Sequence, residues 1–571
     1  MSAIPAALHA ALQLLPTPEA AEESAPTEAV PRSNFQPVGN PFLQRFALHR
    51  MLGAFVAATG VLEAKRGASY HAWLHRLRLL DRLPGSWSVE SVVDTLPVIG
   101  SRPVAPCPDL PPGVTGPWPQ RPVLAPGLYS PVMNLSREEE QRHLSFNVLR
   151  YLGQATTTLP RAVWKASARA RLAEMNDVTF ASLLQDTTYA QYICKGLDPK
   201  DLHPFRHLLR RPASEYYKVD FELFAEMQTI DPEMPQTGSV TLLERDSTGR
   251  FWPLAIQLGD RVIEPQHGPA WELARYFVLQ HAATQTVVVW HPRLHFPCDA
   301  VHAITLSLLP DGHPIKRLML PHTPLTLGLH QAVMHNHRSV FHNNQREIFA
   351  PMAYTTKAIR DAAAKGRAGI AGNRGYPEYR WGDDLLGDHV SYGHYRREWA
   401  AAFFRLCEGA LAQVSSHDRA VAAWADHISA FVPGFPDSSV IFQGDTLAQA
   451  VSTWMRGVTA FHTADHYSYG RIPMKWSPLR VRAPLPHPDQ TERVPVGRLV
   501  SREDRLRQVL AHELFFRPTV IYRLSEVQYD VEGGRAQHSV DRFFEEVAAI
   551  DAEWSTSSFP TSDQIGASIH Y

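Results

Sequence analysis

Residues 461–470 read Phe-His-Thr-Ala-Asp-His-Tyr-Ser-Tyr-Gly and contain a histidine pair at i, i+4 spacing. They follow a run from Asp445 to Ala460 in which apolar residues recur at helical spacing, which predicts a helix that continues through the pair. His462 and His466 then lie one turn apart on one face. Two imidazoles so placed can point at one metal ion. The alternative is a pair of core histidines satisfied by hydrogen bonds, and the chain's 28 histidines make chance pairs common.

The bulk composition is that of an ordinary globular protein. Of its 571 residues, 44% are hydrophobic and 20% are charged, and the formal net charge is −1. A net charge this close to zero does not attract nucleic acid over the whole surface. No apolar run reaches transmembrane length. The first residues lack the basic start of a signal peptide, and the four cysteines form no CxxC pair. We therefore expect a cytoplasmic protein without an integral membrane segment or a disulfide framework.

The hydrophobic pattern predicts a mainly α-helical protein with a small β-sheet element. Residues 1–40 are typical of a flexible, acidic, Ala/Pro-rich leader. Residues 41–220 are typical of a helical region with a Pro-rich loop, and residues 221–571 of the main core. Short β-type runs over 238–263 are separated by turn signals such as Asp246–Gly249. Helices are expected over 178–194, 271–289, 397–414, 420–431 and 540–554.

Six segments in a fixed order, ending at the last residue, carry a family resemblance. They are Pro253-Leu-Ala-Ile-Gln-Leu258, Trp271-Glu-Leu-Ala-Arg275, His313-Pro-Ile-Lys-Arg-Leu-Met-Leu-Pro-His322 with Thr326, Gly434-Phe-Pro436, the opening stretch and Ile565-Gly-Ala-Ser-Ile-His-Tyr571. Together these segments resemble lipoxygenases over about residues 220–571. The resemblance implies a lipoxygenase-type helical catalytic domain. Residues 1–220 show no run of alternating strands, so we do not expect the family's N-terminal lipid-binding β-barrel.

The resemblance also implies a non-haem iron site, with manganese as the alternative metal. Lipoxygenases hold the ion with histidines from two core helices, an Asn or His, and the main-chain carboxylate of the last residue. His462 matches the third histidine of that set, and His466 matches the Asn/His position. Tyr571 supplies the terminal carboxylate. A gap-free count from Trp271 places His291 at the second histidine position.

The first histidine position is the difficulty in this register. The same count places Thr286 there, so the implied set is one ligand short and Thr286 is left to bond a metal-bound water. His295 then matches a non-ligand histidine of the family. The alternative register makes His291 and His295 the pair, but it requires compensating shifts and leaves Pro292 between the two ligands.

The resemblance implies an iron oxygenase that uses O₂ on an apolar or polyunsaturated substrate. In the family, a hydrogen atom is abstracted from the methylene between two cis double bonds, and oxygen adds to the resulting radical. One alternative is a divergent oxygenase, desaturase or isomerase of specialised metabolism, which a smaller ligand set favours. Another is a non-catalytic relative that has lost the metal. The persistence of His462, His466 and Tyr571 argues against that reading, and the chain has no GxSxG motif of a serine hydrolase.

Overall fold

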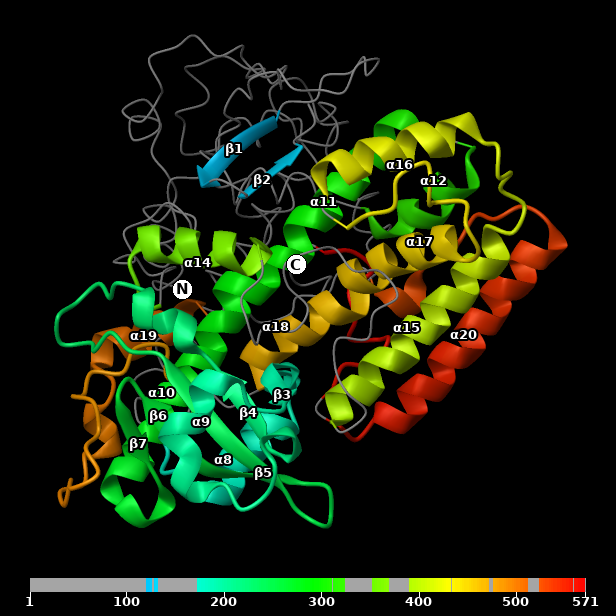
Figure 1. Cartoon of the computed structure of the whole chain (residues 1–571). Helices are drawn as coiled ribbons and strands as arrows, with labels where there is room; N and C mark the ends of the chain where they lie inside the picture. The colour runs from blue at the N-terminus through cyan, green and yellow to red at the C-terminus, as the bar shows by residue number, and fades with distance from the viewer. Residues whose placement is uncertain are drawn as a thin grey trace, which may run out of the picture.

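The computed structural model describes the ranges 120–125, 128–131, 172–310, 312–323, 352–368, 390–432, 434–471, 476–511, 523–557 and 559–569. The expected leader over 1–40, most of the region 41–220 and the proposed ligand Tyr571 lie outside these residues. The domain boundaries therefore stay predictions. Within the described ranges the protein is mainly helical with a small sheet, as the sequence predicts (Figure 1).

Long helices make up the body of the molecule. Their bounds are α8 (Asp177–Gln185), α9 (Pro199–Phe205), α10 (Pro269–Gln285), α11 (His291–Leu308), α12 (Pro314–Met319), α14 (Thr356–Ala368), α15 (Ser391–Ala410), α16 (Arg419–Phe431), α17 (Thr446–Arg456), α18 (His462–Arg471), α19 (Arg502–Ala511) and α20 (Gly534–Trp554). α15 and α20 run side by side as a long pair, and α17 packs against α15 (Figure 1). The helices predicted over 271–289, 397–414, 420–431 and 540–554 are confirmed, with shifted ends. None of the helices in the described ranges is long and apolar enough to cross a membrane.

The β-element is larger than predicted. Five antiparallel strands pair in chain order: β3 (Ile193–Lys195), β4 (Tyr217–Asp220), β5 (Ser239–Arg245), β6 (Phe251–Leu258) and β7 (Arg261–Ile263). The predicted turn at Asp246–Gly249 is confirmed. The Asp246 carboxylate accepts the backbone N–H groups of Thr248 and Arg250, and Gly249 adopts a φ of 90°. A separate hairpin joins β1 (Gln120–Ala125) to β2 (Leu128–Pro131) inside the Pro-rich loop.

The helix predicted over 178–194 is wrong in its second half. α8 ends at Gln185, and the chain continues through a 3₁₀ turn over Thr188–Tyr192 into β3. Thr187 caps that turn by accepting the Tyr189 N–H at 3.1 Å. Ile193 then pairs with Val219 on the neighbouring strand. An apolar run this short is compatible with either a helix or a strand. Here, pairing with the neighbouring strand β4 makes it a strand.

Two long helices each contain a π turn and supply the site described below. The π segment η7 (Thr286–Trp290) joins α10 to α11, and η9 (Gly457–Phe461) joins α17 to α18. The backbone at the junctions stays in the right-handed helical region, so each helix passes through its π segment without ending. The predicted continuation of the helix 445–460 through the histidine pair is therefore confirmed. π turns inside α-helices occur frequently at functional sites.

Trp454 connects these two helices. It lies on α17, its side chain is fully buried, and its indole N–H donates to the Cys298 carbonyl on α11 at 2.8 Å. Its ring also contacts the rings of His302 and His322, with centroids 6.4 and 6.5 Å away. One buried side chain therefore links the two helices that carry π turns.

The described end of the chain, residues 559–569, packs into the core beside α18. Ile565, Ala567 and Ile569 are fully buried. His322 contacts the Ala567 carbonyl through Nδ1 at 2.6 Å, and the Gly566 N–H donates to Thr463 Oγ1 at 3.1 Å. This segment is therefore fixed next to the residue that follows His462.

Candidate metal centre

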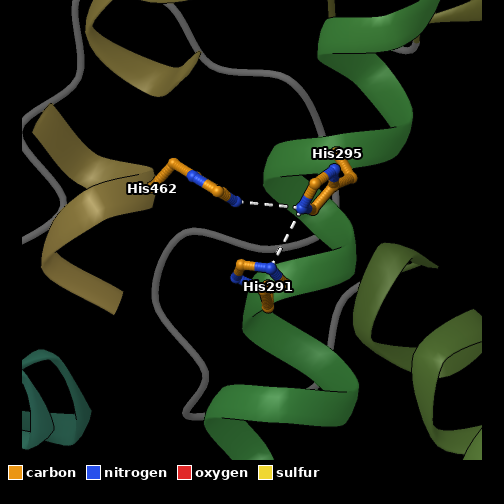
Figure 2. A group of neighbouring side chains, drawn as sticks. All are labelled: His291, His295 and His462. Carbon is orange, nitrogen blue, oxygen red and sulfur yellow. Dashed lines mark hydrogen bonds between the residues drawn. The ribbon is translucent and has the colours of Figure 1, made fainter. Parts of the chain in front are cut away.

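Three histidine side chains from α11 and α18 converge on one point (Figure 2). His295 Nε2 lies 3.0 Å from His291 Nε2 and 3.0 Å from His462 Nε2. One ring nitrogen of each residue lies within 4.8 Å of those of the other two. His462 is fully buried, whereas His291 and His295 are half-buried. We call these residues the histidine triad, and they could hold a metal ion.

The spacing of the triad fits metal ligands better than a hydrogen-bonded cluster. Each imidazole nitrogen presents either one hydrogen or one lone pair, so His295 Nε2 can form a good hydrogen bond with only one of its two neighbours. A metal–nitrogen bond of about 2.1 Å places two cis ligands of an octahedron about 3.0 Å apart. The two short Nε2–Nε2 distances match that separation.

His466, a ligand in the sequence prediction, lies beside the triad. It follows His462 by one helical turn, as its spacing predicts. Its ring centroid is 4.6 Å from that of His462 and 4.8 Å from that of His291, and the side chain is 6% exposed. Its nitrogens are outside the group of three whose ligand atoms all lie close together. The structure therefore brings His291, His462 and His466 into contact, and it adds His295.

The position of His295 favours the alternative register, in which it pairs with His291. α11 is a regular helix from His291 onward, so residues four apart project to the same side. Pro292 does not end the helix, because it closely follows the π segment, where the widened turn already interrupts the regular i→i−4 hydrogen bonds. The sequence signal for this pair was the i, i+4 spacing of the two histidines.

Thr286, predicted to stand near the metal, is bonded elsewhere. It begins the π segment and is fully buried. Its hydroxyl donates to the Ala282 carbonyl at 2.8 Å and lies 2.7 Å from the Tyr192 hydroxyl. Because the single hydroxyl hydrogen of Thr286 goes to Ala282, the Tyr192 hydroxyl is the donor in this second bond. Burial raises the pKa of Tyr192 well above its usual value.

Two buried ionisable residues that the sequence analysis did not identify, Asp465 and Arg396, lie near the triad. Asp465 on α18 is fully buried, and its Oδ2 is 3.9 Å from His291 Nδ1. Burial raises the pKa of the Asp465 carboxyl, while His291 and the Arg396 guanidinium oppose that shift. Arg396 comes from α15 and is 5% exposed. A charge inside an apolar core helix was the available sequence signal for Asp465.

The similarity of this chain to known proteins lies in its three-dimensional structure. No protein-family model matches the chain, and no curated protein matches it by sequence. The manganese lipoxygenase of Gaeumannomyces graminis is similar in structure, with a TM-score of 0.62 at 14% sequence identity over 80% of this chain and 95% of that one. The chain has the lipoxygenase fold.

Two further lipoxygenases share this fold. A calcium-dependent 11R-lipoxygenase matches with a TM-score of 0.57 at 15% identity, over 69% of this chain and 66% of that one. A lipoxygenase solved anaerobically in complex with arachidonate matches with a TM-score of 0.54 at 14% identity, over 69% of this chain and 67% of that one. The chain thus spans about two thirds of the length of these two proteins. The protein therefore has the lipoxygenase fold at low sequence identity and carries a triad that could hold a metal.

Proposed function

We propose that this protein is a lipoxygenase-like oxygenase that binds iron or manganese and oxidises an apolar or polyunsaturated substrate with O₂ by hydrogen-atom abstraction. The observation that carries the proposal is the histidine triad, whose nitrogens converge at metal-ligand spacing inside this fold. A bound iron or manganese ion would supply the one-electron oxidant for the abstraction. The manganese named for one similar structure and the arachidonate named for another support the choice of metal and substrate class.

The proposed ligand set includes five groups. His291 and His295 present their Nε2 atoms from α11, and His462 presents its Nε2 from α18. His466 is proposed as the fourth ligand, because its ring lies beside those of His291 and His462 and is almost fully buried. The α-carboxylate of Tyr571 is proposed as the fifth. Imidazole alone would suit zinc as well as iron, whereas an oxygen ligand shifts the preference toward iron and manganese.

The case for Tyr571 rests on the segment before it. Gly566 is hydrogen-bonded to Thr463, the residue after His462. Five residues of extended chain span at most about 17 Å, so the terminal carboxylate can reach the triad. We expect that one glycine added after Tyr571 displaces this carboxylate and lowers metal affinity at least tenfold. Binding of Mn²⁺ by the extended chain and by an otherwise identical Tyr571→Phe variant, which keeps the carboxylate in place, measures the effect. Equal affinity of the extended and native chains would exclude the C-terminal ligand.

Elemental analysis and oxygen uptake test the proposed function directly. We expect the purified protein to contain near one equivalent of iron or manganese, and linoleate or arachidonate to stimulate oxygen uptake with the appearance of conjugated-diene absorbance. A saturated fatty acid of the same length is the matched control, because it lacks the doubly allylic methylene. Protein that contains the metal but consumes no oxygen would favour a different oxidative reaction. Protein without either metal, or with zinc alone, would contradict the proposal.

A further inference from the structure

A buried carboxylate beside the triad lacks hydrogen-bond partners. Asp465 is fully buried, and neither of its carboxylate oxygens has a hydrogen-bond partner within the described residues. Moving a carboxylate out of water is costly unless a donor or an opposite charge compensates it. A carboxylate at this position would destabilise the fold unless neighbouring groups compensated its charge, so the groups around Asp465 indicate what it does.

The first of these groups is His291. Its Nδ1 lies 3.9 Å from Asp465 Oδ2 and has no hydrogen-bond partner among the residues that the structure describes, while its Nε2 faces His295 at 3.0 Å. An imidazole that gives one nitrogen to a metal carries its hydrogen on the other nitrogen. The ring of His291 is therefore oriented as a metal ligand with a carboxylate behind it would be: Nε2 faces the triad and Nδ1 faces Asp465.

The separation of this pair can close by a small movement. A charge-assisted N–H···O bond is about 2.7–2.9 Å long, so His291 Nδ1 and Asp465 Oδ2 are about 1 Å too far apart for one. The terminal torsion of a histidine side chain is broad and tolerates rotation of the ring. Rotation about that torsion moves Nδ1 toward or away from the carboxylate while the backbone of α11 stays in place.

The second group is Arg396, which supplies the opposite charge. Its guanidinium lies 4.1 Å from the ring centroid of Phe461 and 5.7 Å from that of Trp290. Those aromatic residues end the two π segments η9 and η7. Arg396 Nε and Nη1 have no hydrogen-bond partner in the described part of the chain. The aromatic faces stabilise this cation, and its positive charge opposes the rise that burial causes in the pKa of Asp465.

We propose that Asp465 is a positioning residue of the metal centre: it accepts the Nδ1 hydrogen of His291, fixes the ring with Nε2 toward the metal, and adds a negative charge that Arg396 balances. The proposal rests on the triad's binding a metal, as proposed above. Carboxylates that orient a ligand histidine in this way raise its basicity and typically change metal affinity by about 10–100-fold. The added negative charge also stabilises the trivalent metal over the divalent one.

Metal binding by the variant Asp465→Asn tests this role. Asparagine keeps the size of the side chain and removes its charge. Full-length wild-type and variant proteins are stripped with a chelator and titrated with Mn²⁺, and free Mn²⁺ is followed by electron paramagnetic resonance. We expect the variant to bind Mn²⁺ about 10–100-fold more weakly. The visible bands of the Co²⁺-loaded protein should shift as well, which a purely structural role would not cause.

Asp504 provides the matched control. It is buried and paired with Arg480 at 2.7 Å and with Arg482 at 2.5 Å, so Asp504→Asn also removes a buried charge from an ion pair. Its Mn²⁺ affinity and Co²⁺ spectrum should equal those of the wild type. Where Asp465→Asn does not fold, the double variant Asp465→Asn/Arg396→Met removes both buried charges and should bind Mn²⁺ as weakly as expected for the single variant.

The outcomes separate this role from the proposed function. Weakened Mn²⁺ binding with a shifted Co²⁺ spectrum in the Asp465 variant, and neither change in the Asp504 control, supports the positioning role. Wild-type affinity in a folded Asp465 variant overturns it and leaves the metal centre intact. A wild-type protein that binds neither Mn²⁺ nor Fe²⁺ overturns the positioning role together with the proposed function.

Discussion

Replacing His295 with alanine is expected to abolish metal loading, with a larger loss of affinity than the about 10–100-fold that changes behind a ligand cause. His295 Nε2 is the one nitrogen that lies 3.0 Å from both other members of the triad. Its loss removes one ligand. It also removes the imidazole that lies between His291 on α11 and His462 on α18. Elemental analysis of the purified variant, with Mn²⁺ titration of the stripped protein, measures the loss. The side chain is half-buried, so the truncation should leave the fold intact.

The gap-free register, which places Thr286 at a ligand position, makes a different prediction about metal binding. The substitution Thr286→His tests it. If Thr286 occupied a ligand position, a histidine there would restore a complete set and tighten metal binding. We expect no gain, because the Thr286 hydroxyl is bonded to Tyr192 and to the Ala282 carbonyl in a fully packed site. We expect instead a loss of about 1–3 kcal/mol in the free energy of unfolding from overpacking. Tighter Mn²⁺ binding by Thr286→His, or unchanged loading in His295→Ala, would restore the gap-free register.

Trp454→Ala is expected to be the most destabilising of these substitutions, with a loss of about 3–5 kcal/mol in the free energy of unfolding. The side chain is fully buried, and its indole links α17 to the Cys298 carbonyl on α11. Because α11 carries His291 and His295 and α17 continues into α18, which carries His462, the cavity should also loosen the approach of the three imidazoles. Urea unfolding of the metal-free protein measures the first effect, and Mn²⁺ titration in the absence of urea measures the second.

The control for this substitution is Trp454→Phe. Phenylalanine retains most of the buried ring and loses the hydrogen bond, whose removal costs about 0.5–1.5 kcal/mol. A phenylalanine variant that matches the alanine variant in stability would show that the hydrogen bond, rather than the packing, connects the helices. An alanine variant as stable as the wild type would show that the two helices are held together elsewhere.

Much of the fold could be predicted from local sequence patterns, because the relevant signals are periodic. Helical spacing over 445–460 identified the helix that continues into α18, and the short β-type runs between turn signals identified β5, β6 and β7. The pattern failed where a segment is too short to show a period. Ile193–Lys195 continues an apolar run that reads as helix, and pairing with Tyr217–Asp220, which is distant in sequence, makes it a strand.

The metal centre was predictable only in part, for a different reason. The pair on α18 follows from spacing, and His291 follows from counting along the chain. That count assumes that the chain has neither gained nor lost a residue relative to the family pattern. It therefore places Thr286 at the first ligand position and leaves His295 out, whereas the structure brings His295 to His291 on α11. Asp465 was missed because the role proposed for it depends on His291 and Arg396, which come from other helices.

The two π turns also separate two requirements that each helix must meet. The half before the turn is held by packing in the core, and the half after it must aim imidazoles at a common point. A π turn accommodates one extra residue locally in the backbone. The orientation of the half after the turn can therefore differ from that of a regular helix while the half before it keeps its packing. Removing a residue within 286–290 would return the turn to an ordinary helix with both halves still in place. Removing one between His291 and His295 would instead rotate one imidazole about 100° away from the other.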